Sequence, residues 1–100
     1  MDINVAWHTR DFLERLPFGS LGQNVLIDTS VKLIGVEHIF LGDNVRIDAG
    51  TLIIATGRIS IGSRLHLAAN CYLEGRGGLA IKTYEHLSHY VIRHTRSLSH

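Results

Sequence analysis

The sequence has 100 residues, enough for one small domain with a modest core. Apolar residues make up 45% of it and charged residues 19%, which excludes a disordered chain, and the net charge of +1 gives no bulk attraction to nucleic acid or to an anionic membrane. A single cysteine, Cys71, excludes an internal disulfide and a cysteine-rich zinc site.

The segment 1–20 is predicted to form a cap. It contains several charged residues and no apolar segment of the kind found in signal peptides, and no later run approaches the roughly 18 apolar residues of a membrane span. We therefore expect a cytoplasmic protein with no membrane partner. Thr9 is a suitable N-cap for a short helix with Phe12, Leu13 and Leu16 on one face, and this helix should cover the open end of the structure that follows.

Residues 21–81 repeat with a period of 20, because the string that starts at Leu21 returns in related form at Leu41 and Ile61. Each period divides into two units of six residues and one of eight, and a short strand with a turn fits each unit. The first position of every unit is Leu or Ile and should point inward. These positions are Leu21, Ile27, Leu33, Leu41, Ile47, Ile53, Ile61, Leu67 and Leu73. The fifth positions should also point inward, and they are Val25, Val31, Ile39, Val45, Thr51, Ile59, Leu65, Cys71 and Leu79.

The third unit of each period carries two extra residues, and each of these longer units contains glycine. A glycine there suits a turn with positive φ, and the extra residues should stack at one corner. The predicted fold is all-β, a single-stranded parallel β-helix of three coils of about 20 residues behind the short capping helix. A β-sandwich is the alternative, but it has no reason to repeat at a fixed register. The glycines of the longer units are Gly35, Gly57, Gly75, Gly77 and Gly78.

The repeat decays after Ile81. Lys82 stands where a glycine should follow, and Glu85 stands where an inward aliphatic residue belongs. We therefore divide the chain into a cap at 1–20, a β-helix at 21–81 and an irregular His-rich tail at 82–100.

The run from Leu41 to Thr51 resembles the hexapeptide-repeat acyltransferases, above all the sugar O- and N-acetyltransferases of surface-polysaccharide and nucleotide-sugar pathways. Residues 18–25 and 65–69 resemble the same family. The resemblance implies left-handed coils, acetyl-CoA as acyl donor, a sugar or nucleotide-sugar acceptor and a homotrimer. Members of that family are longer, so this chain resembles an N-terminal half, and we expect no acyl transfer by it alone. A truncated or frame-shifted gene product and a natural short protein both stay open.

His66 is the one candidate that the sequence offers for a catalytic group. Acyl transfer needs a general base, which is a histidine between trimer subunits in the resembled family. His66 is predicted to point outward, in one row with Leu26 and Arg46. Arg46 should disfavour the charged imidazolium, which suits a base. A surface histidine on a solenoid face is the alternative interpretation, and no residue is assigned to cofactor binding.

We expect no metal ion. His89 and His94 are five residues apart, as in the trimeric β-helix metalloenzymes of the γ-carbonic-anhydrase class. The glycines that accompany that pair and a third histidine at suitable spacing are absent. Cys71 takes a small inward position and is interpreted as core filler.

A non-catalytic β-helix that trimerises is the alternative function. Leu52 and Tyr72 are predicted to stack one coil apart on an outward face, beside the corner that leads to Phe40, and Leu26 lies in another outward row. A contiguous apolar strip of this kind predicts an interface in a homo-oligomer. Basic residues are scattered without interleaved aromatic residues, so no nucleic-acid partner is expected.

Overall fold

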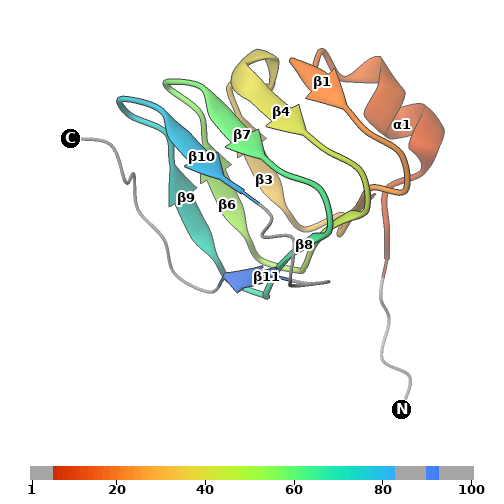
Figure 1. Cartoon of the computed structure of the whole chain (residues 1–100). Helices are drawn as coiled ribbons and strands as arrows, with labels where there is room; N and C mark the ends of the chain where they lie inside the picture. Colours follow the sequence, from red (N-terminus) through yellow and green to blue (C-terminus); the bar gives the residue numbers. More distant parts are fainter. Residues whose placement is uncertain (1–5, 83–89, 93–100) are drawn as a thin grey trace.

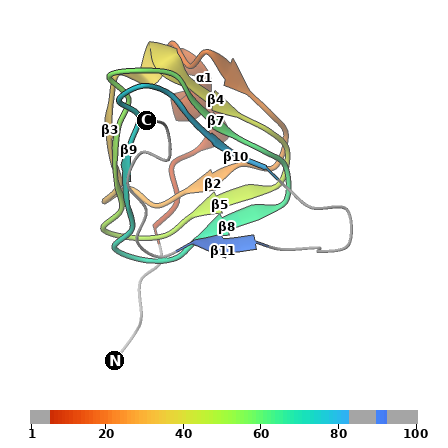
Figure 2. The same ribbon diagram turned by 60° about the vertical axis from the view of Figure 1, so that its left-hand side comes forward.

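The chain winds into stacked coils that form a three-sided prism, seen from the side in Figure 1 and closer to its axis in Figure 2. The structure is a computed structural model that describes residues 6–82 and the strand at 90–92. Each side of the prism is a parallel sheet to which every coil adds one short strand. No helix in these described ranges is long and apolar enough to cross a membrane.

Three sheets make up the sides. The first sheet contains β1 (Ser20–Leu21), β4 (Ile39–Leu41), β7 (Ile59–Ile61) and β10 (Leu79–Ile81). The second sheet contains β2 (Leu26–Ile27), β5 (Val45–Ile47), β8 (Leu65–Leu67) and β11 (Tyr90–Ile92). The third sheet contains β3 (Lys32–Ile34), β6 (Leu52–Ile54) and β9 (Tyr72–Glu74). The helix α1 (Arg10–Arg15) precedes them, and the 3-10 turn η1 (Val36–His38) lies between β3 and β4.

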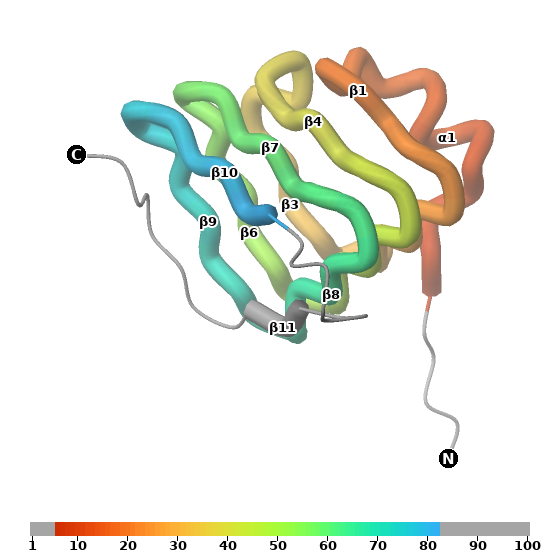
Figure 3. Tube along the Cα trace, viewed as in Figure 1, coloured from red at the N-terminus to blue at the C-terminus, as the bar shows by residue number. Residues whose placement is uncertain are grey.

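The strand register confirms the period of 20. Leu41 pairs with Ile61, Ile47 with Leu67, and the third sheet follows the same rule. Equivalent residues of successive periods therefore lie over one another, as the evenly stacked loops of the tube in Figure 3 show. Since side chains alternate along a strand, a fixed register also fixes which residues point inward. The architecture is the predicted all-β parallel β-helix, consistent with left-handed coils.

The interior is a continuous aliphatic core. All nine predicted fifth positions are buried, and so are seven of the nine first positions. The other two, Leu21 and Leu33, are partly buried and pack against that core. The buried hydroxyl of Thr51 donates to the Ala68 carbonyl and accepts from the Cys71 amide, each at 3.2 Å, so this polar side chain is satisfied inside the coil.

The residues at the corners either adopt a positive φ or allow a close approach between backbones. At one corner Asn24, Asn44 and Arg64 hold φ values of 57°, 58° and 58°, the left-handed region that Asn tolerates better than most residues. At the corner with the extra residues, Gly35 has φ of 78° as the sequence predicts, whereas Gly57 is needed for a close approach. A Cβ on Gly57 would lie 2.5 Å from the carbonyl oxygen of Gly75.

The N-terminal helix α1 closes one end of the prism (Figure 1). The Thr9 hydroxyl accepts a hydrogen bond from the Phe12 amide at 3.1 Å, which confirms the predicted N-cap. Leu13 is fully buried in the core and Leu16 packs partly against it. The expectation for Phe12 was wrong: it is 41% exposed and stacks on the His8 ring with centroids 4.3 Å apart. A helix of only six residues turns one of these side chains away from the coil.

The predicted tail at 82–100 contains one described strand, and the division into cap, β-helix and tail stays a prediction. β11 pairs in parallel with β8, with Val91 opposite His66. Val91 lies one repeat period plus five positions beyond His66, whereas Arg46 and His66 are separated by a single period. The second sheet therefore has a fourth strand that the period of 20 residues did not predict.

Candidate functional site

The outward row of the second sheet carries the candidate residue that the sequence singled out. Leu26 pairs with Arg46, and Arg46 pairs with His66, so the predicted row is present. His66 is partly exposed between the buried side chains of Leu65 and Leu67. The strand alternation that buries its neighbours therefore turns the imidazole outward.

Asp48 joins this row from the corner just after β5. Its Oδ2 lies 2.7 Å from Nε2 of His66, and its Oδ1 accepts a hydrogen bond from Nε of Arg46 at 2.8 Å. The side chains of Asp48 and His66 are 19% and 26% exposed, so the pair is partly shielded from water. Both carboxylate oxygens of Asp48 are thus occupied, one by each neighbour.

The charge state of Asp48 decides how the His66 ring is oriented. Burial raises the pKa of the Asp48 carboxyl, but hydrogen bonds from His66 and Arg46 and the charges of these groups together bring that pKa below its ordinary value. An ionised carboxylate can only accept hydrogen bonds, so Nε2 of His66 carries the proton in this contact. The lone pair of the neutral ring then lies on Nδ1, which makes no hydrogen bond within the described residues.

Arg46 has a partner that the sequence analysis did not consider. Its guanidinium is paired with Asp48, and the group directly beside His66 is that carboxylate, while the expected effect of Arg46 on a charged His66 stays a prediction. On its other side the Arg46 guanidinium lies 5.5 Å from the centroid of the Trp7 ring, a cation–π distance. Trp7 is placed by the N-terminal segment, where the amide of the next residue, His8, donates to the Ile27 carbonyl at 2.9 Å.

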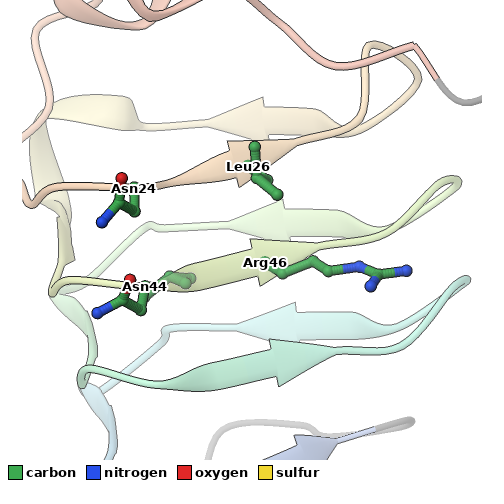
Figure 4. A pocket seen from close by; sticks show the side chains of 5 residues that line it. Asn24, Leu26, Asn44 and Arg46 are labelled. Atoms are coloured by element: carbon green, nitrogen blue, oxygen red, sulfur yellow. The ribbon is translucent and has the colours of Figure 1, made fainter.

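A shallow hollow lies beside Arg46 on the same face. It has a volume of about 320 Å³ and is lined by Asn24, Leu26, Asn44, Val45 and Arg46. Figure 4 shows the two asparagines stacked at the corner and Leu26 above Arg46, whose side chain extends away from Asn44. Amide groups, an aliphatic side chain and a guanidinium next to the Asp48–His66 pair give this face the mixed polarity of a ligand surface.

The equivalent corner in the preceding coil does not repeat the arrangement. Asp28 occupies the place of Asp48 one repeat earlier, but its Oδ1 accepts from the amide and the hydroxyl of Ser30 at 2.8 and 2.7 Å. These two hydrogen bonds, the larger effect coming from the hydroxyl, bring the pKa of Asp28 below its ordinary value. In the following coil, the corner residue is Ala68. Among the described residues of this corner, Asp48 is therefore the carboxylate that makes a hydrogen bond with a histidine.

Sequence reasoning found His66 and missed its partner. The sequence analysis did not single out Asp48, although it follows Arg46 by two positions and Arg46 precedes His66 by one repeat. Because successive repeats lie over one another, this spacing puts a carboxylate near the histidine of the next coil. That spacing was the signal that could have found it.

The remaining candidates are Cys71, His38, His89 and His94. Cys71 is buried in the core as predicted, and His38 is an exposed corner residue 3.8 Å from Glu37. His89 and His94 lie outside the described residues. Within residues 6–82 no three His, Cys, Asp or Glu side chains come together as metal ligands, and the expectation of no metal stays a prediction.

No family model matches the sequence, and no curated protein matches it. Solved structures do match, among them AntD, an N-acyltransferase from Bacillus cereus. A mutant of AntD in complex with dTDP and coenzyme A has a TM-score of 0.77 and 28% identity, over 91% of this chain and 46% of AntD. Another mutant, in complex with dTDP-4-amino-4,6-dideoxyglucose and coenzyme A, has a TM-score of 0.69 and 33% identity, over 81% and 42%. AntD with dTDP and 3-hydroxybutyryl-CoA has a TM-score of 0.69 and 29% identity, over 93% and 45%.

This chain therefore spans a little under half the length of these structural neighbours. Together with the repeat and the stacked coils, these similarities show that the chain has a parallel β-helix fold like that of the N-acyltransferase AntD.

Proposed function

We propose that this chain is part of an acyl-CoA-dependent acyltransferase that modifies an amino or hydroxyl group of a sugar or nucleotide sugar in the cytoplasm. The observation that carries the proposal is the contact of 2.7 Å between Asp48 and His66 on an outward strand. The neighbours support the reaction class, because AntD is an N-acyltransferase and its structures contain coenzyme A and a dTDP-linked amino sugar.

His66 is the candidate general base in this proposal. An acceptor amine or hydroxyl attacks the thioester carbonyl, a new C–N or C–O bond forms, and the C–S bond of the donor breaks. The proton lost by the acceptor passes to Nδ1 of His66, and the released thiolate takes up a proton in turn. Asp48 holds the ring through Nε2 and so keeps Nδ1 directed at the outward face.

The first test is a binding experiment that does not require turnover. Titration with dTDP-4-amino-4,6-dideoxyglucose or acetyl-CoA, followed by NMR of the histidine rings, should shift the His66 signals saturably. The signals of His38, exposed at a corner, are the internal control and should not move. If the His66 signals stay fixed while the fold remains intact, His66 does not belong to a ligand site.

The second test is acyl transfer, measured as release of the coenzyme A thiol. Because the chain spans less than half of its structural neighbours, we expect no transfer above background by the 100-residue chain alone. Turnover by this chain would contradict that expectation. Loss of such turnover in His66→Ala, with binding retained, would establish His66 as the base.

A non-catalytic assembly module is the second candidate function. The third sheet favours it, since its outward side chains include Leu52, Ile54 and Tyr72, all partly exposed, and Ile34, which is 53% exposed. We propose that this face packs in a homotrimer. A trimer that binds neither donor nor acceptor would favour the assembly module over the enzyme.

A further inference from the structure

The outward face of the first sheet contains a hollow that the acyl-transfer proposal does not use. The outward residues of its four strands are Ser20, Phe40, Ser60 and Ala80. Three of these side chains are small, so the face is recessed beside the single aromatic ring. The hollow has a volume of about 400 Å³, and its described lining extends along the sheet to Lys82.

The outward-facing Phe40 ring is held in place by residues of the neighbouring coils. A Cβ on Gly19 would lie 2.4 Å from the ring carbon Cζ, so the ring rests directly on the backbone of Gly19. The guanidinium carbon of Arg58 lies 3.8 Å from the ring centroid on the neighbouring coil. Phe40 is therefore partly covered, and it contributes less to an apolar interface than the sequence suggested.

Within the described residues, Arg58 is held in place without a carboxylate. The Phe40 ring contacts its guanidinium, and its Nε donates to the Ser60 hydroxyl at 3.1 Å. Among the described arginines, Arg10, Arg46 and Arg76 each pair with an acidic side chain, but Arg58 does not. Within the part of the chain that the structure describes, its two terminal nitrogens therefore keep their donors for another acceptor.

The described lining of the hollow carries charge of one sign. Arg58 and Lys82 line it, and none of its described lining residues is acidic. An oriented guanidinium presents a planar pair of N–H donors that matches phosphate oxygens, and a lysine adds a mobile point charge. The ring and the Ser60 contact fix the guanidinium beforehand, which lowers the entropy lost when an anion binds.

We propose that this hollow binds the pyrophosphate of a nucleotide-type ligand, with Arg58 as the oriented donor and Lys82 as the second cation. The site is on a different side of the prism from His66, and it does not depend on acyl transfer. The pyrophosphate could come from an acyl-CoA donor or from a nucleotide sugar, since both carry this group.

The test is a titration of the whole chain with inorganic pyrophosphate in about 0.15 M KCl, followed by backbone amide NMR. The amides of Gly42, Ser60 and Gly62, which line the hollow, should shift saturably. Arg58→Gln should weaken binding at least tenfold and Arg58→Lys by less, because a lysine keeps the charge without the planar donors. Arg15→Gln, which removes an exposed cation from α1, should change nothing and is the matched control.

Two results would overturn the proposal. One is the lack of any saturable shift at these amides with pyrophosphate. The other is an equal loss of affinity in Arg58→Gln and Arg15→Gln, which would mean non-specific charge attraction. Parallel titrations with coenzyme A and with dTDP identify the source, because the true ligand should saturate the same amides at a lower concentration than pyrophosphate does. If the amides respond while the His66 ring does not, this site stands and the proposed acyltransferase site falls.

Discussion

The second and third sheets are built from the same repeat, yet their outward faces differ in chemistry. The second sheet presents Arg46 and His66, joined by Asp48, whereas the third presents Leu52 and Tyr72 at equivalent strand positions. Both faces share one buried interior, so the repeat restricts only the inward half of each strand. The outward half can therefore acquire a polar site on one side and an association surface on another without disturbing the fold.

Replacement of Ile47 by Asp should have the largest effect. Ile47 is fully buried in the middle coil, so an unpaired carboxylate there should cost roughly 3 kcal/mol or more in the free energy of unfolding. Ile47→Val should cost only about 1 kcal/mol, and Arg46→Ala, one residue away on the outward face, should cost little. Thermal melts of the three variants measure this. An unchanged melting temperature in Ile47→Asp would mean that the inward register is wrong.

Two glutamates on the third sheet should abolish the predicted trimer. Leu52→Glu with Tyr72→Glu places charges in the apolar strip, and light scattering should change from a trimer mass to a monomer mass. Thr29→Glu with Thr56→Glu, at exposed corners, carries the same added charge and should remain trimeric. A wild-type chain that is monomeric at high concentration would refute the interface. Polydisperse species unaffected by the glutamates would indicate pairing at strand edges instead.

Loss of the helix cap should have a moderate effect. Thr9→Ala removes the hydroxyl that accepts from the Phe12 amide and should cost about 1 kcal/mol in the free energy of unfolding. Thr29→Ala, an exposed threonine outside the helix, is the control. A chemical denaturation series that finds the two variants equally stable would show that α1 contributes no stability through its cap.

The smallest effect should be the pH dependence that Asp48 adds. The pKa of Asp48 in the folded chain is below its ordinary value of 3.8, so its contribution is fully present above that value and is lost as the pH falls through the folded pKa. Wild type should therefore lose stability relative to Asp48→Asn as the pH falls below about 3.8. Urea midpoints at several pH values test this, and parallel curves for the two proteins would contradict it.

The interior of the fold was predictable from the sequence because strand alternation and coil stacking require each inward position to hold a buried side chain of the core. The outward contacts were not, since they depend on side-chain directions between coils, as the Asp48–His66 contact shows. Phe40 was predicted as an exposed interface residue. The sequence did not reveal that its ring is partly covered, because the covering residues, Gly19 and Arg58, lie outside its own strand. β11 was missed because the strand that follows β8 by one period of 20 residues would lie earlier in the chain than β11 does.

The offset of β11 has a consequence for how such a coil grows. Val91 takes its place opposite His66 although more chain separates them than the single period that separates His66 from Arg46. The exposed edge of the finished coil thus acts as a template, and the arriving strand is aligned by hydrogen bonds to that edge and not by its distance along the chain. Extra length is absorbed between strands at a modest entropic cost. A β-helix of this kind can therefore be lengthened at a corner, in evolution or by design, while the strands above and below keep their alignment.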